Sequence, residues 1–281
     1  MSGGILSFKF IGALYSALIV PVVYLRWQSR DKRAENEAFL RTHGLVAPEE
    51  ERQRAITHLM SGDAIRVDSN EHFEGSRNCL VVRKRVAQQA KGSVLEIGIG
   101  TGEHSIPQLM RNTKVASLCG IDNHSVSLAV CEDTCSRNAS KEITLVRGRA
   151  EELPFSNNSF DTVISQFSLC SIEDPVKAVQ EMARVAKNRI VILEHGLSYW
   201  SVVRWLGYWT SMFPDPQHPW SYGCYQNRDV LDIIKESGVK IQKLNTSSLG
   251  HVYLIQLVPT NNNQLCIDTP TPNVVYRSPH S

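Results

Sequence analysis

The sequence lacks a large excess of charge of either sign. Its 30 lysines and arginines nearly balance 28 aspartates and glutamates, which leaves a formal net charge of +2 over 281 residues. This value is too close to neutral for a surface that coats nucleic acid, so the composition argues against nucleic acid as a substrate or partner. Hydrophobic residues make up 42% and charged residues 21% of the chain, which supports a packed core and argues against global disorder.

Cysteines at the spacing of a metal site are also lacking. The chain has seven cysteines, an odd number, and no two of them form a CxxC pair. No cysteine and histidine are spaced as in a zinc site, so the sequence predicts no metal. Cys131 and Cys135 are four positions apart, which places them on one face of a helix. We interpret the cysteines as free thiols in a reducing compartment rather than as a disulfide framework.

One long apolar run is present, near the N-terminus. Ile5–Leu25 carries a single charge, Lys9, and a helix of this length at about 1.5 Å per residue matches a hydrocarbon core of about 30 Å. The basic residues that follow it are typical of an interfacial anchor. The pattern predicts a transmembrane helix in residues 1–30 and a helical linker in residues 31–74. A cleaved signal peptide and an anchor lying in one leaflet stay open as alternatives.

A glycine-rich turn follows a short apolar strand at Ser93–Ile97. The turn reads GIGTG over residues 98–102, and a helix is predicted from His104 to Met110. Strand, turn and helix in this order form the crevice at the carboxyl end of a first parallel strand in a doubly wound sheet. The turn lacks the G-x-G-x-x-G spacing of pyrophosphate binders, and Glu96 precedes it. An acid there suits the amino-acid end of S-adenosylmethionine.

The rest of the predicted domain alternates strands and helices. A second strand, Ser117–Ile121, ends at Asp122, whose carboxylate is placed to accept hydrogen bonds from ribose hydroxyls; a plain tight turn with a capping aspartate is the alternative. We expect one α/β domain over residues 75–258 with a seven-stranded mixed sheet, followed by a disordered tail over residues 259–281. The further predicted strands are 143–146, one ending at 165, 189–193, 239–245 and 251–258, and the helices are 176–186 and 229–237.

Several motifs in order resemble a known family. LEIGIGTG, GID, GRAEELPFSNNSFDTVIS and a strand ending in LEHG, between Val94 and Gly196, resemble class I methyltransferases of the UbiE and methyltransferase type 11 group. The resemblance implies a Rossmann-like doubly wound sheet and S-adenosylmethionine as the cofactor. It implies that Glu96, Gly98, Gly100 and Gly102 line the methionine and ribose, that Asp122 holds the ribose hydroxyls, that Asn123, Ala150 and Glu151 flank the adenine, and that Gln166 and Phe167 flank the methyl group.

Two positions depart from the family's pattern. The family usually has an acid where Arg149 stands, and arginine has no hydrogen-bond acceptor for the adenine amino group. A proline-glycine-glycine turn before the fifth strand is replaced by the shorter Ala186–Asn188. Both leave room for a degenerate enzyme. The alternative is that Arg149 has a fitted role, by stacking on adenine or by pairing with Glu151 or Glu152.

The acceptor side of the site is less clearly marked. Leu197–Tyr225 contains four of the five tryptophans, which predicts either a lid over the acceptor or a helix packed on the sheet or lying on a membrane. His195 follows a strand end beside the donor and is the first candidate for a base or an acceptor-orienting residue, and His218 is the second. A hydrogen-bonded structural histidine is the alternative for each.

A finer resemblance concerns membrane-anchored branches of the family. LCSIEDPVKAV, LEHGLSYW and the His218-x4-Gly223-Cys224 spacing resemble fungal mitochondrial inner-membrane Oms-type proteins and animal microsomal thiol S-methyltransferases. This resemblance implies an enzyme that methylates a small, lipophilic acceptor near a membrane, in the mitochondrial inner membrane or alternatively in the endoplasmic reticulum. The competing hypothesis is a non-catalytic mitochondrial assembly factor that retains the fold.

Overall fold

The computed structural model describes residues 77–138, 140–210, 225, 227–259 and 272–278. The predicted membrane anchor and helical linker, residues 1–30 and 31–74, lie outside the described residues. Among the helices that the structure describes, none combines the length and the apolar character that crossing a lipid bilayer requires.

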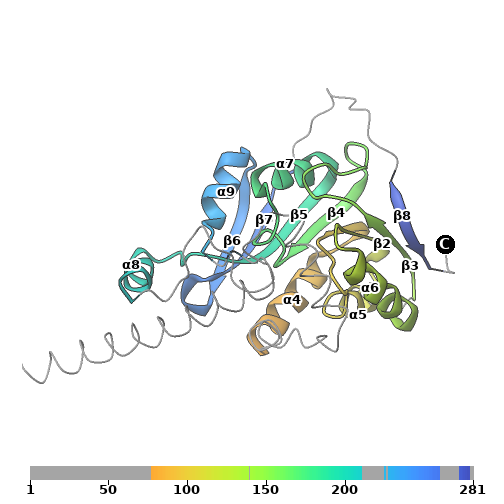
Figure 1. Cartoon of the computed structure of the whole chain (residues 1–281), viewed down its shortest axis with the longest axis horizontal. Coiled ribbons are helices and arrows are strands. Elements are labelled where there is room, and N and C mark those ends of the chain that lie inside the picture. Colours follow the sequence, from red (N-terminus) through yellow and green to blue (C-terminus); the bar gives the residue numbers. More distant parts are fainter. Residues whose placement is uncertain (1–76, 139, 211–224, 226, 260–271, 279–281) are drawn as a thin grey trace, which may run out of the picture.

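A single mixed sheet forms the centre of the domain (Figure 1). Its order is β6-β7-β5-β4-β1-β2-β3-β8. The strands β1 to β5 are parallel to their neighbours in this series, whereas β7 runs antiparallel to both β5 and β6. This arrangement confirms the predicted doubly wound α/β sheet with a closing antiparallel pair. The strands are β1 (Gly92–Ile97), β2 (Val115–Asp122), β3 (Glu142–Arg147), β4 (Phe160–Gln166), β5 (Ala186–His195), β6 (Ile241–Ser247), β7 (Val252–Leu257) and β8 (Asn273–Arg277).

The eighth strand corrects the predicted count of seven and the prediction of a tail disordered throughout. β8 pairs antiparallel with β3, with Tyr276 opposite Leu145. The Ser278 hydroxyl accepts a hydrogen bond from the Ile143 amide at 3.0 Å, and Tyr276 packs against the core. Without β8, β3 would be an open edge of the sheet. The polar composition of the tail as a whole concealed a short β-branched and aromatic segment, NVVYR, that suits an edge strand.

Helices cover both faces of the sheet (Figure 1). α4 (Arg77–Gln89), α5 (Ile106–Arg111) and α6 (Ser125–Asn138) pack on one face, and α7 (Pro175–Val185) and α9 (Val230–Ser237) pack on the other. The sequence predicted α5, α7 and α9, with small differences at their ends, but gave no indication of α4. α8 (Ser201–Thr210) lies outside both layers in Figure 1, and a short 3-10 turn, Ser248–Gly250, connects β6 to β7.

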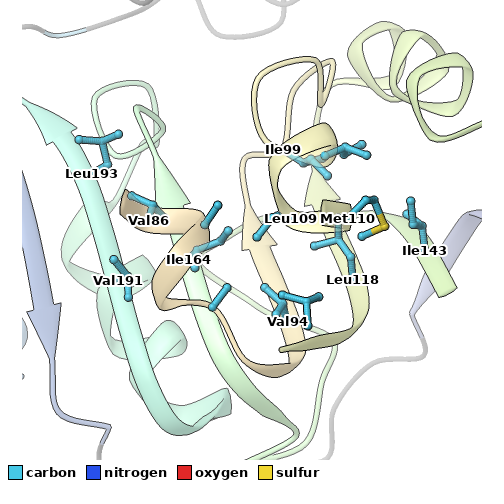
Figure 2. Close-up of a cluster of buried hydrophobic side chains, with 14 of the residues drawn as sticks. Val86, Val94, Ile99, Leu109, Met110, Leu118, Ile143, Ile164, Val191 and Leu193 are labelled. Atoms are coloured by element: carbon cyan, nitrogen blue, oxygen red, sulfur yellow. The ribbon is translucent and has the colours of Figure 1, made fainter. Parts of the chain in front are cut away.

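Alternate residues of each central strand enter the two halves of the core. Figure 2 shows Val94 and Val191 within the cluster that α4 and α5 cover, whereas their neighbours Leu95 and Ile192 belong to the cluster beneath α7 and α9. A strand that is buried on both faces cannot shift its register without exposing apolar side chains. This double burial therefore fixes the carboxyl ends of β1, β2, β4 and β5 along one edge of the sheet.

Candidate active site

The glycine-rich turn leaves β1 at this edge. Gly98, Gly100 and Gly102 all have positive φ angles, of 64°, 57° and 70°, a region that side chains other than glycine rarely adopt. A Cβ on Gly98 would lie 2.5 Å from the Ser168 Cβ, so packing also requires glycine there. A Cβ on Gly100 would instead meet no atom within 4 Å. The backbone at Gly100 is thus left open for a ligand to approach closely.

Asp122, the last residue of β2, holds this turn in place. One carboxylate oxygen accepts a hydrogen bond from the Gly100 amide at 2.8 Å, and the other accepts one from the His124 amide at 2.9 Å. Burial raises the pKa of Asp122, and these amide hydrogen bonds oppose that rise. Each carboxylate oxygen has a second lone pair, so the group is able to accept ribose hydroxyls as well. The neighbouring Asn123 side chain is exposed.

Glu96 and Gln166 form a buried polar pair beside the turn. The Gln166 amide donates a hydrogen bond to Glu96 Oε1 at 3.0 Å, and the two residues are only 2% and 6% exposed. Burial raises the pKa of Glu96 to about 7, against the opposing effects of Ser105, Gln166 and the positive charge of Arg83. Glu96 Oε2 and Gln166 Oε1 have no well-oriented hydrogen-bond partner among the described residues.

These buried acceptors test whether S-adenosylmethionine fits the site. A buried polar atom without a partner is costly, at about 1–3 kcal/mol. The α-amino group of S-adenosylmethionine is a donor that would satisfy acceptors of this kind, and the open backbone at Gly100 provides the close approach that a bound ligand needs. The residues present therefore fit this cofactor.

Arg149, the main departure from the family's pattern, forms ion pairs on the predicted adenine side. Its Nη2 lies 2.8 Å from Glu173 Oε2 and 3.3 Å from Glu151 Oε1. Glu151 is buried, and its Oε1 also accepts a hydrogen bond from the Asp174 amide at 3.3 Å. The predicted alternative pairing with Glu151 is thus confirmed, while the pairing with Glu173 was not anticipated. Ala150, which lies between Arg149 and Glu151 in the chain and is predicted to flank the adenine, is half-buried.

Phe167 occupies a strained position directly after β4. Its φ angle is 55°, which is rare for a bulky residue, and its amide donates a hydrogen bond to the Leu193 carbonyl at 2.7 Å. The Arg83 guanidinium lies 4.8 Å from the centre of the Phe167 ring, and the His195 ring stacks on it at 5.3 Å between centroids. Backbone strain of this kind costs about 1–3 kcal/mol and is concentrated at functional sites.

His195 ends β5 and is buried with two other reactive side chains. Its Nε2 lies 4.0 Å from Glu194 Oε1, and possible ligand atoms of Cys170, Glu194 and His195 all lie within 4.8 Å of one another. Burial raises the pKa of Glu194, and the charge of His195 opposes the rise. His195 therefore lies at the carboxyl end of β5, as predicted, and stacks on Phe167. The second candidate, His218, lies outside the described residues.

Sequence reasoning missed several residues of this edge. Glu194 directly precedes the predicted His195, and its place in the same strand end was the one available signal. Arg83 is on α4, which no pattern predicted, and Cys170 was interpreted as one of the free thiols. Their roles depend on the three-dimensional arrangement, because the spacing along the chain between Arg83, Cys170 and Glu194 carries no recognisable pattern.

Exposed apolar side chains gather beyond the end of β5. Trp200 and Trp205 are 55% and 59% exposed, and Leu249 is 76% exposed with a φ of 54°. Hydrogen bonds connect the two segments, because the Ser198 hydroxyl donates to the Leu249 carbonyl at 2.7 Å and the Tyr199 amide donates to the Gly250 carbonyl at 2.8 Å. The exposure of Trp205 shows that this face of α8 is not packed on the sheet. We call Tyr199, Trp200, Val202, Trp205 and Leu249 the apolar patch.

Comparison with known proteins agrees with this geometry. Residues 95–192 match the model of a methyltransferase domain. The chain is 25% identical to the protein named methyltransferase OMS1, mitochondrial, of Saccharomyces cerevisiae over 210 residues, which cover 68% of this chain and 42% of that protein. It is 34% identical to the demethylmenaquinone methyltransferase of Shouchella clausii over 113 residues, covering 40% and 48%. The chain thus spans less than half the length of these relatives.

A solved structure supports the fold. A SAM-dependent methyltransferase from Aquifex aeolicus superposes with a TM-score of 0.50 and 16% sequence identity, covering 74% of this chain and 98% of that one. At this identity the likeness concerns the fold alone. Residues 95–192 are therefore similar to a methyltransferase domain, and the chain shares its fold with the solved methyltransferase from Aquifex aeolicus.

Proposed function

We propose that the protein transfers a methyl group from S-adenosylmethionine to a small, lipophilic acceptor near a membrane. The observation that carries this proposal is the open backbone at Gly100, next to the buried acceptors of Glu96 and Gln166. A cationic amino-acid group meets complementary partners there, and a glycine turn held by Asp122 lets the rest of the ligand pass close to the main chain. A plain structural turn would need neither feature.

In this proposal the donor residues divide by the part of the cofactor that they contact. Glu96 and Gln166 bind the amino-acid end, and Asp122 accepts the ribose hydroxyls. Asn123, Ala150 and Glu151 flank the adenine. When bound, S-adenosylmethionine supplies a methyl group that is already activated, so the protein contributes mainly by holding acceptor and donor in line.

Phe167 and His195 are assigned to the acceptor side. Phe167 is held in a strained conformation at the strand end nearest Gln166, and His195 stacks on it. A stack of this kind restricts the imidazole to one orientation. His195 then orients the acceptor, or takes its proton where the acceptor has one to lose.

Three observations support a lipophilic acceptor at a membrane. The relatives include an enzyme named demethylmenaquinone methyltransferase. The apolar patch combines tryptophan, tyrosine and aliphatic side chains, as membrane interfaces prefer. The run Ile5–Leu25 suits a membrane anchor. The name of the yeast relative favours the mitochondrion over the endoplasmic reticulum.

The test uses the full chain in lipid vesicles. Calorimetry measures S-adenosylmethionine binding, and labelled methyl transfer is followed with a panel of quinols and thiols. We expect binding and transfer by the wild type. We expect His195→Gln to keep donor affinity within about twofold while transfer falls by at least about a hundredfold, the lower end of the range for a positioned acid or base. A wild type that does not bind the donor would refute the proposal.

The competing hypothesis is a non-catalytic assembly factor, because one fold serves many functions. Its main support in the sequence was Arg149, which replaces an acid. The ion pairs of Arg149 with Glu151 and Glu173 argue for a fitted residue rather than a decayed pocket. Donor binding without methyl transfer to the panel or to any component of a mitochondrial extract would favour the assembly factor.

A further inference from the structure

Three metal-ligating side chains meet at the end of β5, outside the donor pocket. Possible ligand atoms of Cys170, Glu194 and His195 lie within 4.8 Å of one another. We propose that these three residues bind a single Zn²⁺ ion. The sequence predicted no metal, because these three residues lie on two separate segments and do not form a short cysteine and histidine motif.

The pairing of β4 with β5 brings the ligands together. The two strands are parallel, with Gln166 opposite Leu193, and the hydrogen bond from the Phe167 amide to the Leu193 carbonyl extends the pairing by one residue. Glu194 and His195 follow on β5. The chain after Phe167 turns so that the Cys170 Sγ comes within 3.5 Å of the Phe167 carbonyl. The site is therefore built on two adjacent strand ends, which hold ligands more rigidly than a loop does.

The distances suit a tetrahedral ion after small side-chain adjustments. Zinc lies about 2.0–2.3 Å from nitrogen, oxygen and sulfur ligands, so neighbouring ligand atoms are roughly 3.3–3.8 Å apart. His195 Nε2 and Glu194 Oε1 are already 4.0 Å apart, and the remaining pairs are within 4.8 Å. Adjustments of this size are available to side chains without movement of the strands.

Burial provides a second and independent argument. Cys170, Glu194 and His195 are 2%, 0% and 5% exposed. Glu194 Oε1 accepts a hydrogen bond from the His195 amide at 2.9 Å, and the amides of Leu169 and Cys170 also favour the charged carboxylate, whereas the buried Oε2 has no well-oriented hydrogen bond in the described part of the chain. A carboxylate removed from water needs compensation by a cation or by further hydrogen bonds. A bound ion beside Oε2 supplies it.

The kinds of ligand select zinc over the common hard cations. A thiolate and an imidazole suit Zn²⁺, whereas Mg²⁺ and Ca²⁺ prefer sites made of oxygen atoms. Binding would convert the Cys170 thiol to a thiolate and release its proton to solvent. Three protein ligands leave a fourth position open, as in catalytic zinc sites.

The test measures metal directly, so its result does not depend on methyl transfer. The full chain is expressed with zinc, purified without chelators and analysed by mass spectrometry for metal content. We expect one zinc per chain in the wild type and only a trace in Cys170→Ser, Glu194→Gln and His195→Gln. Cys135→Ser is the matched control, because Cys135 is another fully buried free cysteine on α6, and it should keep its zinc.

Cobalt replacement and donor binding complete the experiment. Co²⁺ in the wild type should give a thiolate-to-metal charge-transfer band that Cys170→Ser lacks and Cys135→Ser retains. Calorimetry with S-adenosylmethionine shows that a zinc-free variant is still folded and that the donor pocket is intact. A wild type with far less than one zinc per chain would overturn the proposal. So would a folded Cys170→Ser variant that holds as much zinc as the wild type.

Discussion

The donor and acceptor sides of this edge of the sheet are built in different ways. On the donor side, Glu96, Asp122 and Gln166 lie at the ends of β1, β2 and β4, and they bond to one another or to main-chain amides. On the acceptor side, Cys170, His195 and the apolar patch come from three separate segments, around residues 170, 195–205 and 249. Several predicted residues of that side, including His218, lie outside the described residues.

This difference shows which kind of site can be recognised from the sequence alone. A turn whose backbone binds a ligand needs particular residues at a fixed spacing, so it can be recognised as a motif in the sequence. A surface that receives an acceptor needs side chains from any segments that meet in space. Variants on the donor side should therefore change donor affinity, whereas variants on the acceptor side should change transfer or metal content.

The largest expected effect comes from Gly100→Ala. The new Cβ enters the space that we assign to the ligand, so we expect S-adenosylmethionine affinity to fall by about a hundredfold, or about 2.7 kcal/mol. Gly238→Ala is the matched control: Gly238 also has a positive φ, of 74°, and an open surrounding, but it ends α9. Each variant should lose about 1–2 kcal/mol of folding stability from backbone strain.

Calorimetric titration of both glycine variants separates ligand contact from strain. Equal donor affinities in the two would show that Gly100 does not face the ligand. A normal affinity in Gly238→Ala beside a hundredfold loss in Gly100→Ala would support the donor site.

The next effect is expected from Asp122→Asn. Asp122 accepts hydrogen bonds from two main-chain amides, and the NH₂ group of asparagine would face one of them. The turn would then lose a charge-assisted hydrogen bond, and the ribose would lose an acceptor. We expect donor affinity to fall by roughly thirtyfold, or about 2 kcal/mol. Asp161→Asn is the control, because Asp161 also accepts a main-chain amide, from Ser93 at 3.0 Å, at the opposite end of β1. A similar loss of affinity in the control would refute a specific role for Asp122.

The pH dependence of Glu96 gives a smaller effect. Its pKa in the folded protein, about 7, lies above the ordinary value of 4.5. The folded state therefore keeps a proton that the unfolded state has already lost, and the stability that this proton provides is complete below pH 4.5 and is lost as the pH rises through 7. The decline is at most about 3 kcal/mol. Denaturant titrations should show a smaller decline in Glu96→Gln than in the wild type, because burial also raises the pKa values of Asp122 and Glu194.

Donor binding should have the opposite pH dependence. A cationic amino group prefers the ionised Glu96, so affinity should rise by about tenfold between pH 6 and pH 8, as the ionised fraction of a group with a pKa of about 7 does. The titration of the ligand's own amino group affects the wild type and Glu96→Gln equally, so the difference between their pH profiles reports on Glu96. An identical pH profile in wild type and variant would contradict the assignment of Glu96 to the amino-acid end.

The smallest effect is expected from Arg149→Asp. This substitution places a third carboxylate beside Glu151 and Glu173, so we expect donor affinity to fall by about threefold, in line with the modest energies of exposed ion pairs. Adding Glu173→Lys restores an opposite-charge pair and should recover most of the loss. Tighter binding by Arg149→Asp would instead mean that the arginine is a decayed adenine contact.

The comparison also explains how far the sequence predicted the molecule. The core strands and the glycine-rich turn were predictable, because apolar runs and glycine-rich turns are local patterns. α4 was not predicted, although its Arg83 contacts Phe167. β8 was missed because an edge strand depends on the neighbour that it pairs with, and that neighbour, β3, lies more than a hundred residues earlier in the chain.

The sequence by itself determined the doubly wound sheet and the glycine-rich turn that follows β1, because strand burial and backbone turns constrain residues that are close together in the chain. Only the tertiary structure decided that Arg149 pairs with Glu151 and Glu173, that Phe167 is strained against His195, and that Cys170 meets Glu194. Contacts between side chains on different segments depend on the order and register of β4 and β5, and no local pattern records that register.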